Sequence, residues 1–148
     1  MIDALMPIIS DSYLVIIPLL IVYLICSKKK NVYPILLAIL LTFLVVTAMK
    51  MTIVTPRPCA GIVGVCEDPL DSFPSRHAAV VSAVLVFLWS KKPLFIAYSA
   101  YVLLIAFSRL YMGAHYLQDV LVGALIGICI GYVCLKFSGR LGLERRVV

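Results

Sequence analysis

Two histidines and a few basic residues stand inside or beside long apolar segments of this sequence. Charged and imidazole side chains are unfavourable near hydrocarbon, so their presence there marks a functional site by default. Together they supply positive donors, a nucleophile, a carboxylate to orient it and a second imidazole as acid, which is the set of groups that phosphoryl transfer needs. The residues form three clusters: Lys50 with Arg57-Pro58, Ser75-Arg76-His77, and Arg109 with His115 and Asp119.

The third cluster contains the candidate nucleophile. His115 and Asp119 are four residues apart at the start of the last apolar segment, so on a helix they share one face. A carboxylate there can hold one imidazole nitrogen protonated and leave the other as a nucleophile or a base. Taken alone, such a pair more often has the structural role of fixing the end of a helix. Neighbouring cations lower the pKa of a histidine and Asp119 raises it, so the sequence leaves the net shift open.

The cations of the clusters are suited to phosphate. Arg57 lies between two prolines, Lys50 ends the second apolar segment, and Arg109 precedes His115 by six residues. Arginine offers a planar fork that matches phosphate oxygens, and lysine contributes a movable point charge. Snorkelling to lipid headgroups explains one or two such residues. It does not explain why they gather beside the only two histidines.

The middle cluster predicts a helix start that can hold an anion. Ser72 or Ser75 can cap the helix, and Pro74 suits its first turn. Free amides and the positive end of the helix dipole make a phosphate cradle at such a place. Serine and proline also mark ordinary helix starts, and His77 directly afterwards favours the functional interpretation.

These clusters must be positioned by a membrane-embedded helical bundle. The chain has 148 residues, 64% of them hydrophobic and 14% charged, and a mean hydropathy of +1.12. We therefore expect an all-α, polytopic membrane bundle with one domain over residues 1–148. A short interfacial helix with Ile2, Leu5, Met6 and Ile9 on one face is expected to precede five spans. The spans are Ser12–Cys26, with Pro18 expected to kink it, Val32–Met49, Ala78–Ser90, Pro93–Tyr111 and Leu117–Phe137.

The basic residues predict the orientation of the bundle. The net charge of +6 is spread between apolar runs without interleaved aromatic residues, so we expect no nucleic-acid partner. Lys50, Arg57, Arg76 and Arg109 lie at one set of helix ends, and the other nine basic residues lie at the opposite ends. The positive-inside rule then places the N-terminus and the active site outside the cell membrane and the C-terminus in the cytoplasm. The nine are Lys28, Lys29, Lys30, Lys91, Lys92, Lys136, Arg140, Arg145 and Arg146.

Cysteines and glycines carry structural predictions. Cys59 and Cys66 lie in the long loop Thr55–Phe73, which is expected to be outside the membrane. A disulfide between them is slightly favoured over two free thiols. Cys26, Cys129 and Cys134 lie in apolar segments and are expected to be packing residues. Gly123, Gly127 and Gly131 recur every four residues and predict an internal packing face of the last helix rather than a dimer seam.

The three clusters resemble the signature of the type 2 phosphatidic acid phosphatase superfamily. That signature reads Lys-x6-Arg-Pro, then Pro-Ser-Gly-His, then Ser-Arg-x5-His-x3-Asp. Here the first part runs from Lys50 to Pro58, the second from Pro74 to His77 with Arg76 in place of glycine, and the third from Ser108 to Asp119. A three-part match with this spacing is highly specific.

The resemblance implies an enzyme and a role for each residue. His115 would attack phosphorus and form a phosphohistidine, Asp119 would orient His115, and His77 would protonate the leaving oxygen. Phosphate oxygens would be held by Lys50, Arg57, Ser75 and Arg109, together with backbone amides near Arg76. The family needs no metal or other cofactor, and fixed cations can neutralise the charge that a metal neutralises elsewhere.

Two features depart from the family pattern. Arg76 replaces a glycine that helical backbone angles do not require, and it is a candidate contact for a second phosphate. Many family members have six spans and this chain has five, so lipid or a second copy of the chain is expected to cover the remaining surface.

The substrate is expected to be a lipid phosphate. From His77 to Ser90 the predicted third helix is about 21 Å long, against about 30 Å for a bilayer core, so the site is recessed unless residues 71–76 extend the helix. An undecaprenyl or dolichyl-type polyprenyl diphosphate is narrowly favoured over its monophosphate, phosphatidylglycerophosphate or phosphatidic acid. A non-catalytic anion-binding protein or channel is the alternative of another class, and phosphotransfer to an alcohol remains open.

Overall fold

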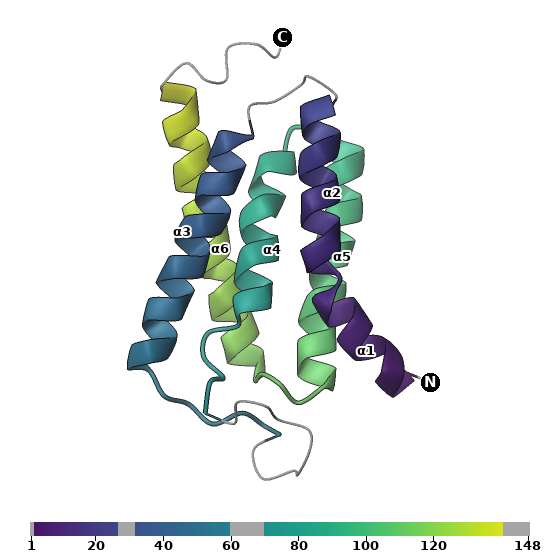
Figure 1. The fold of residues 1–148 in the computed structure, drawn as a ribbon, viewed down its shortest axis with the longest axis vertical. Coiled ribbons are helices and arrows are strands. Elements are labelled where there is room, and N and C mark those ends of the chain that lie inside the picture. Colours follow the sequence, from purple (N-terminus) through teal and green to yellow (C-terminus); the bar gives the residue numbers. More distant parts are fainter. Residues whose placement is uncertain (1, 27–31, 60–69, 141–148) are drawn as a thin grey trace.

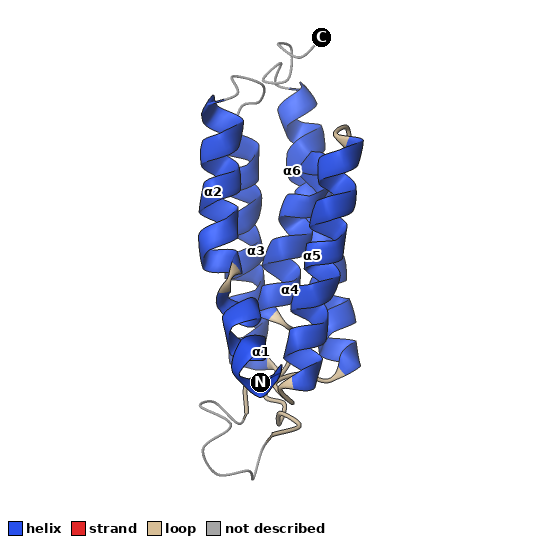
Figure 2. Ribbon diagram, turned by 90° about the vertical axis from the view of Figure 1, so that its right-hand side faces the viewer, coloured by secondary structure: helices blue, strands red, loops and turns tan. Residues whose placement is uncertain are grey.

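The chain folds as a bundle of helices. The computed structural model describes residues 2–26, 32–59 and 70–140, with the backbone alone for residues 2–4, 25–26 and 139–140. Within these ranges there is no strand beyond an isolated pairing of Thr55 with Asp71 (Figure 2). This confirms the predicted all-α fold. The elements are α1 (Ile2–Asp11), α2 (Tyr13–Cys26), α3 (Tyr33–Thr52), α4 (Arg76–Leu85), the 3₁₀ helix η1 (Val86–Leu88), α5 (Lys92–Tyr111) and α6 (Leu117–Arg140).

Four segments are long and apolar enough to cross a membrane: Leu5–Leu24, Tyr33–Thr52, Lys92–Tyr111 and Leu117–Ser138. Their outer faces leave large apolar side chains exposed, for example Leu40 on α3 and Leu125 on α6. An aqueous solvent would oppose such exposure, whereas lipid tails solvate it. The chain therefore has the helices of an integral membrane protein. The predicted span at Ala78–Ser90 corresponds to α4 followed by one 3₁₀ turn, and these elements begin and end two residues earlier than predicted, at Arg76 and Leu88.

The ends of the helices separate into two groups. The N-terminus, the α3–α4 connection and the α5–α6 turn lie at one end of the bundle, and the C-terminus lies at the other (Figure 1). Lys91 lies in the α4–α5 turn and Lys92 begins α5, at the same end of the bundle as the C-terminus. Residues 28–30, 145 and 146, which also entered the charge count, lie outside the described residues. The arrangement matches the predicted grouping, and which end faces the cytoplasm stays a prediction.

The short helix α4 is the centre of the bundle. Every residue from Ala78 to Val84 is buried, and α4 packs most extensively against α6. A Cβ added at Gly123, Gly127 or Gly131 of α6 would overlap a backbone carbonyl of the α4 segment. The glycine stripe is thus an internal packing face, as predicted, and it brings α6 against the first turn of α4.

Enlarging Gly127 is expected to destabilise the bundle. A Gly127→Ala Cβ would overlap the carbonyl oxygen of Ala79, and separating the two backbones should lower the free energy of unfolding by about 1–3 kcal/mol. Thermal unfolding in detergent measures this, with Leu125→Ala on the exposed face of the same helix as the control. Equal stability of Gly127→Ala and the wild type would contradict the close packing.

The N-terminal segment is one apolar stretch broken at Ser12. The Ser12 hydroxyl donates to the carbonyl oxygen of Ile9 at 2.6 Å and also hydrogen-bonds with the Tyr101 hydroxyl of α5 at 2.9 Å. A side chain that bonds its own helix backbone competes with helix continuation. Consequently α1 turns away from the axis of α2 (Figure 1) and packs on α5, with Met6 and Ser10 buried. The predicted N-terminal helix is confirmed, and its interfacial position stays a prediction.

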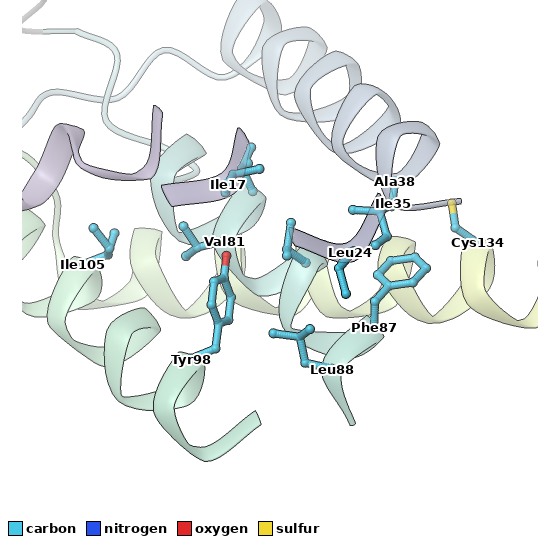
Figure 3. Packing of buried hydrophobic residues seen from close by; sticks show 12 residues of the cluster. Ile17, Leu24, Ile35, Ala38, Val81, Phe87, Leu88, Tyr98, Ile105 and Cys134 are labelled. Carbon is cyan, nitrogen blue, oxygen red and sulfur yellow. The ribbon is translucent and has the colours of Figure 1, made fainter. Parts of the chain in front are cut away.

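Apolar side chains from α2, α3, α4, α5 and α6 fill the interior. Figure 3 shows Ile17, Val81, Tyr98 and Ile105 within one cluster, with Leu24, Ile35, Phe87 and Cys134 beside them. Cys134 is buried, as expected of a packing residue, whereas Cys129 is exposed. The core occupies the length of the bundle away from the three sequence clusters. It therefore holds the helix ends that carry those clusters in place.

Candidate functional site

His115 and Asp119 lie beside each other, as their spacing predicts. His115 is in the α5–α6 turn, and Asp119 is in the first turn of α6. The Nδ1 atom of His115 is 3.7 Å from Oδ2 of Asp119, and the two side chains are 2% and 1% exposed. This distance is longer than a hydrogen bond. Nδ1 is therefore the ring nitrogen that faces the carboxylate. The other ring nitrogen, Nε2, is the one suited to nucleophilic attack.

Asp119 connects two of the three clusters. Its Oδ2 accepts from the Ser72 hydroxyl and from the backbone N–H of Tyr116 at 2.9 Å, the second being the reach-back to the N-cap residue that is typical of helix starts. Its carbonyl oxygen accepts from the Ser75 N–H at 3.0 Å. Of the two serines expected as possible helix caps, Ser75 occupies the N-cap position and Ser72 holds the carboxylate. Asp119 is therefore fixed before any substrate is present.

The electrostatic surroundings of His115 favour its neutral form. Burial, followed by the positive charges of Arg109, Arg57 and Lys50, holds the pKa of the His115 imidazole well below its usual value. This settles the sign that the sequence left open. A neutral imidazole has a free lone pair, so His115 is in the state that nucleophilic attack requires.

Lys50 and Arg57 share a carboxylate that sequence reasoning missed. Lys50 Nζ donates to the carbonyl oxygen and to Oδ1 of Asp71, at 2.8 and 2.9 Å, and Arg57 Nη2 lies 3.7 Å from Oδ2 of Asp71. Asp71 lies four residues before Ser75, and no spacing in the sequence pairs it with Lys50 or Arg57. Residues 71–75 are not helical, which rules out the longer third helix. Asp71 fixes both cations at the same end of the bundle.

Arg57 and Arg109 are each anchored by one further contact. Arg57 Nη1 donates to the carbonyl oxygen of Ala114 at 3.3 Å, next to His115. Arg109 is 8% exposed, and its Nη1 donates to the hydroxyl of Ser10 in α1 at 2.6 Å. Ser10 is a second residue that the sequence did not indicate, because it lies 99 positions away from its partner.

The second cluster forms the first turn of α4. Ser75 is the N-cap residue by position, but its side chain makes no capping hydrogen bond. Arg76 is helical, so the glycine of the family signature is not required here. The Arg76 guanidinium lies 5.1 Å from the centre of the Phe43 ring. His77 has Nε2 3.6 Å from Oδ1 of Asp11 and packs edge-on against Tyr13 with ring centres 4.8 Å apart.

The site retains buried polar atoms without protein partners. Among the described residues, eight side-chain atoms are buried and lack a hydrogen bond, and five of them belong to predicted site residues. Native proteins rarely leave such atoms unpaired. Unpaired donors on several residues at one end of the bundle are what an anion-binding site offers its ligand. The five atoms are Arg57 Nε, Ser75 Oγ, Arg76 Nε, Arg109 Nε and His115 Nδ1.

The two histidines belong to one electrostatic environment. Arg109, Arg57 and Lys50 each act on both His77 and His115. The structure thus brings the three clusters to one end of the bundle, as expected. Within the part of the chain described, no three His, Cys, Asp or Glu side chains gather as metal ligands would.

The predicted disulfide falls partly outside the described residues. Cys59 is disulfide-bonded, and its predicted partner Cys66 is not among the residues described, so the pairing stays a prediction. The Cys59 N–H donates to the carbonyl oxygen of Gly113 at 3.0 Å. Gly113 has φ of +61°, which glycine adopts without strain. These contacts attach the start of the α3–α4 connection to the turn that carries His115.

Comparisons with known proteins identify the family of the chain. Over 73 residues the chain is 37% identical to the undecaprenyl-diphosphatase of Sulfolobus acidocaldarius, covering 47% of this chain and 35% of that protein. The matched segment is therefore about a third of the length of that curated relative. The crystal structure of Aquifex aeolicus LpxE superposes with a TM-score of 0.76 and 34% identity, covering 91% of this chain and 86% of that one. Residues 31–142, most of the chain and all three clusters, match the PAP2 superfamily, and the chain belongs to that superfamily.

Proposed function

We propose that the protein is a membrane-embedded phosphatase of lipid phosphates or diphosphates that works through a phosphohistidine at His115. One observation carries the proposal: buried donors without protein partners on Arg57, Ser75, Arg76 and Arg109 lie at the same end of the bundle as the His115 imidazole, which faces a carboxylate held in place by the protein. Positive donors that are placed before the reaction are the main means of stabilising phosphoryl transfer. Family membership supports the same chemistry.

In the first step, His115 Nε2 attacks phosphorus in line with the leaving oxygen. The N–P bond forms as the P–O bond breaks, and His77 gives its proton to the leaving oxygen. Asp119 faces Nδ1 and stabilises the positive charge that develops on the His115 ring. Lys50, Arg57, Ser75 and Arg109 hold the oxygens of the transferred phosphoryl group, together with backbone amides near Arg76.

In the second step, water replaces His115 on phosphorus. His77, now neutral, takes a proton from the attacking water, the N–P bond breaks, and inorganic phosphate leaves. The proton taken from water restores the acid form of His77, so the cycle closes without any other reactant. The fixed cations supply the charge neutralisation, and we propose that no metal or cofactor takes part.

A lipid diphosphate is the favoured substrate. From Arg76 to Leu88, α4 and η1 span about 21 Å, which is shorter than the roughly 30 Å of a bilayer core and supports a site below the outer headgroups. A polyprenyl diphosphate is preferred narrowly, in keeping with the undecaprenyl-diphosphatase of Sulfolobus acidocaldarius to which the chain is similar. Phosphatidylglycerophosphate and phosphatidic acid are the alternatives. The site is proposed to face the extracytoplasmic side.

The decisive assay measures phosphate release from a panel of lipids in the presence of EDTA. The panel contains polyprenyl diphosphate, polyprenyl monophosphate, phosphatidylglycerophosphate and phosphatidic acid, with a soluble sugar phosphate as the non-lipid comparison. We expect the highest kcat/KM with polyprenyl diphosphate and the lowest with the sugar phosphate. Including an alcohol and measuring its phosphorylation distinguishes phosphotransfer from hydrolysis. No release from any lipid would favour the non-catalytic, anion-binding interpretation.

Arg76→Gly is expected to reduce diphosphate turnover more than monophosphate turnover. The guanidinium stands at the first turn of α4 with a buried, unpartnered Nε, and we assign it to the second phosphate. The loss of one charge-assisted hydrogen bond should lower the ratio of the two kcat/KM values about tenfold. An unchanged ratio would contradict this assignment.

The acid side of the pH profile is expected to lie below pH 6.5 and to respond to Arg57. The pKa of His115 is lowered by burial and then by Arg109, Arg57 and Lys50, so protonation inactivates it only at a pH below its ordinary value. Arg57→Gln removes one repelling charge, raises the pKa of His115, and should move the acid limb of kcat/KM to higher pH. The ionisation of the free substrate is common to both proteins. A limb that moves to lower pH would refute the electrostatic account.

A further inference from the structure

The junction between α1 and α2 touches two residues of the family signature. Ser10 is fully buried and accepts from Arg109 Nη1 at 2.6 Å. Asp11 places Oδ1 3.6 Å from His77 Nε2, and the Tyr13 ring packs edge-on against the same imidazole. All three side chains precede residues 31–142, the segment that matches the superfamily. The superfamily match therefore does not include them.

We propose that the junction Ser10–Tyr13 completes the active site, with Ser10 a positioning residue for Arg109 and Asp11 a positioning residue for His77. The proposal rests on the phosphatase reaction proposed above. It adds a hydroxyl and a carboxylate to the groups that determine how the site works. Neither touches the phosphoryl group; each acts through a residue that does.

Ser10 fixes the orientation of the Arg109 fork. A buried guanidinium has several donors, and one of them is taken by the Ser10 hydroxyl. Arg109 Nε is buried without a protein partner, which leaves it for a phosphate oxygen. The pairing of Nη1 with Ser10 holds the planar group in one rotation, so less conformational freedom is lost when phosphate binds. Removing the hydroxyl should therefore weaken phosphate binding.

Asp11 helps His77 to hold the proton that it must donate. The charged groups around His77 are Arg76 on its own helix, Arg109 on α5, Lys50 on α3 and Arg57 in the connection after α3. Burial of the imidazole, and then the positive charge of each of these four groups, disfavours a proton on it. Tyr13 of α2 packs against the imidazole in a T-shaped contact. Among the described residues, Asp11 of α1 is the carboxylate that lies within ion-pair distance of His77. Its negative charge opposes the repulsion, reduced by water because Asp11 is 68% exposed.

The chain offers a matched control in the same junction. Ser12 bonds Ile9 and Tyr101 and contacts neither Arg109 nor His77 through a hydrogen bond. Ser12→Ala therefore perturbs the break between α1 and α2 without removing a contact to the signature residues. Ser12→Ala should leave kcat/KM within about twofold of the wild type, because it changes the surroundings of the site and removes no contact to Arg109 or His77.

The experiment measures full-length Ser10→Ala, Asp11→Asn and Ser12→Ala proteins in lipid bilayers with a polyprenyl diphosphate. We expect Ser10→Ala to raise KM about tenfold with a smaller change in kcat, and Ser10→Thr to restore it. Asp11→Asn should move the alkaline limb of the pH profile about 0.5 units to lower pH, and Asp11→Glu should restore it. Calorimetric binding of inorganic phosphate should weaken in Ser10→Ala to a similar extent as KM rises.

The inference is overturned if Ser10→Ala leaves both KM and phosphate affinity unchanged and Asp11→Asn leaves the pH profile in place. It is also overturned if Ser12→Ala reproduces both effects, because the junction would then act only through folding. An inactive wild type that binds phosphate normally, with weaker binding in Ser10→Ala, would contradict the phosphatase proposal while supporting the Ser10 contact. The two failures are therefore distinguishable.

Discussion

Replacing His115 with alanine is expected to lower kcat/KM for every lipid phosphate by at least about 10³-fold, because the nucleophile is lost and no other histidine faces Asp119. The substituted side chain is buried beside the start of α6, so stability must be followed in parallel. Steady-state phosphate release in EDTA and thermal unfolding of the same preparation measure the two effects separately.

A His115→Gln variant serves as the control for packing, since it keeps a polar side chain at the buried position without a nucleophilic imidazole. Both variants should be inactive and should bind inorganic phosphate, because the cations of Arg57 and Arg109 remain. Activity above one tenth of the wild-type value in either variant would contradict the assignment of His115 as nucleophile.

The second large effect is expected at His77 and depends on the leaving group. His77→Ala should lower turnover of a lipid monophosphate by about 10²–10⁴-fold, because an alkoxide leaves poorly without a proton donor. With nitrophenyl phosphate the leaving oxygen needs no proton, so formation of the phosphoenzyme should be almost unaffected. A diphosphate lipid, whose leaving group is itself a phosphate, should fall between the two.

The order of these three substrates is the informative result for His77. Equal losses with all of them would indicate that His77 supports the structure or binds phosphate, and would contradict its role as general acid. Single-turnover measurements are required for nitrophenyl phosphate, since the same variant is expected to slow the later hydrolysis step in which His77 acts as base.

The sequence predicts those elements of the fold that are determined by local patterns of residues. Apolar length predicts α3, α5 and α6 to within a few residues, and the four-residue glycine spacing correctly predicts the packing of α6. The end of α4 was not predicted. Its last turn tightens into η1 at Val86–Leu88, and tertiary packing of a fully buried helix decides such an ending more than local propensity does.

The site likewise contains residues that the sequence predicts and residues that it does not. Lys50, Arg57, His115 and Asp119 are recognised from their spacing, because the signature itself fixes their order along the chain. Asp71 and Ser10 are absent from any such spacing, since their partners lie 21 and 99 positions away. A single sequence does not show contacts of that kind. The sequence left Ser72 and Ser75 as alternative caps for a related reason. A serine hydroxyl can cap a helix locally or bond a distant group, and the Ser72 hydroxyl donates to the buried Asp119 carboxylate.

Chemical trapping of the covalent intermediate tests the central claim most directly. His77→Ala is incubated with radiolabelled nitrophenyl phosphate, quenched in alkali, where phosphohistidine is stable, and digested to locate the label. The account predicts one alkali-stable, acid-labile phosphoryl group on the peptide that contains His115, and none in a His77→Ala protein that also carries His115→Ala. Phosphate release without any label on His115, or a label that persists when His115 is replaced, would contradict it.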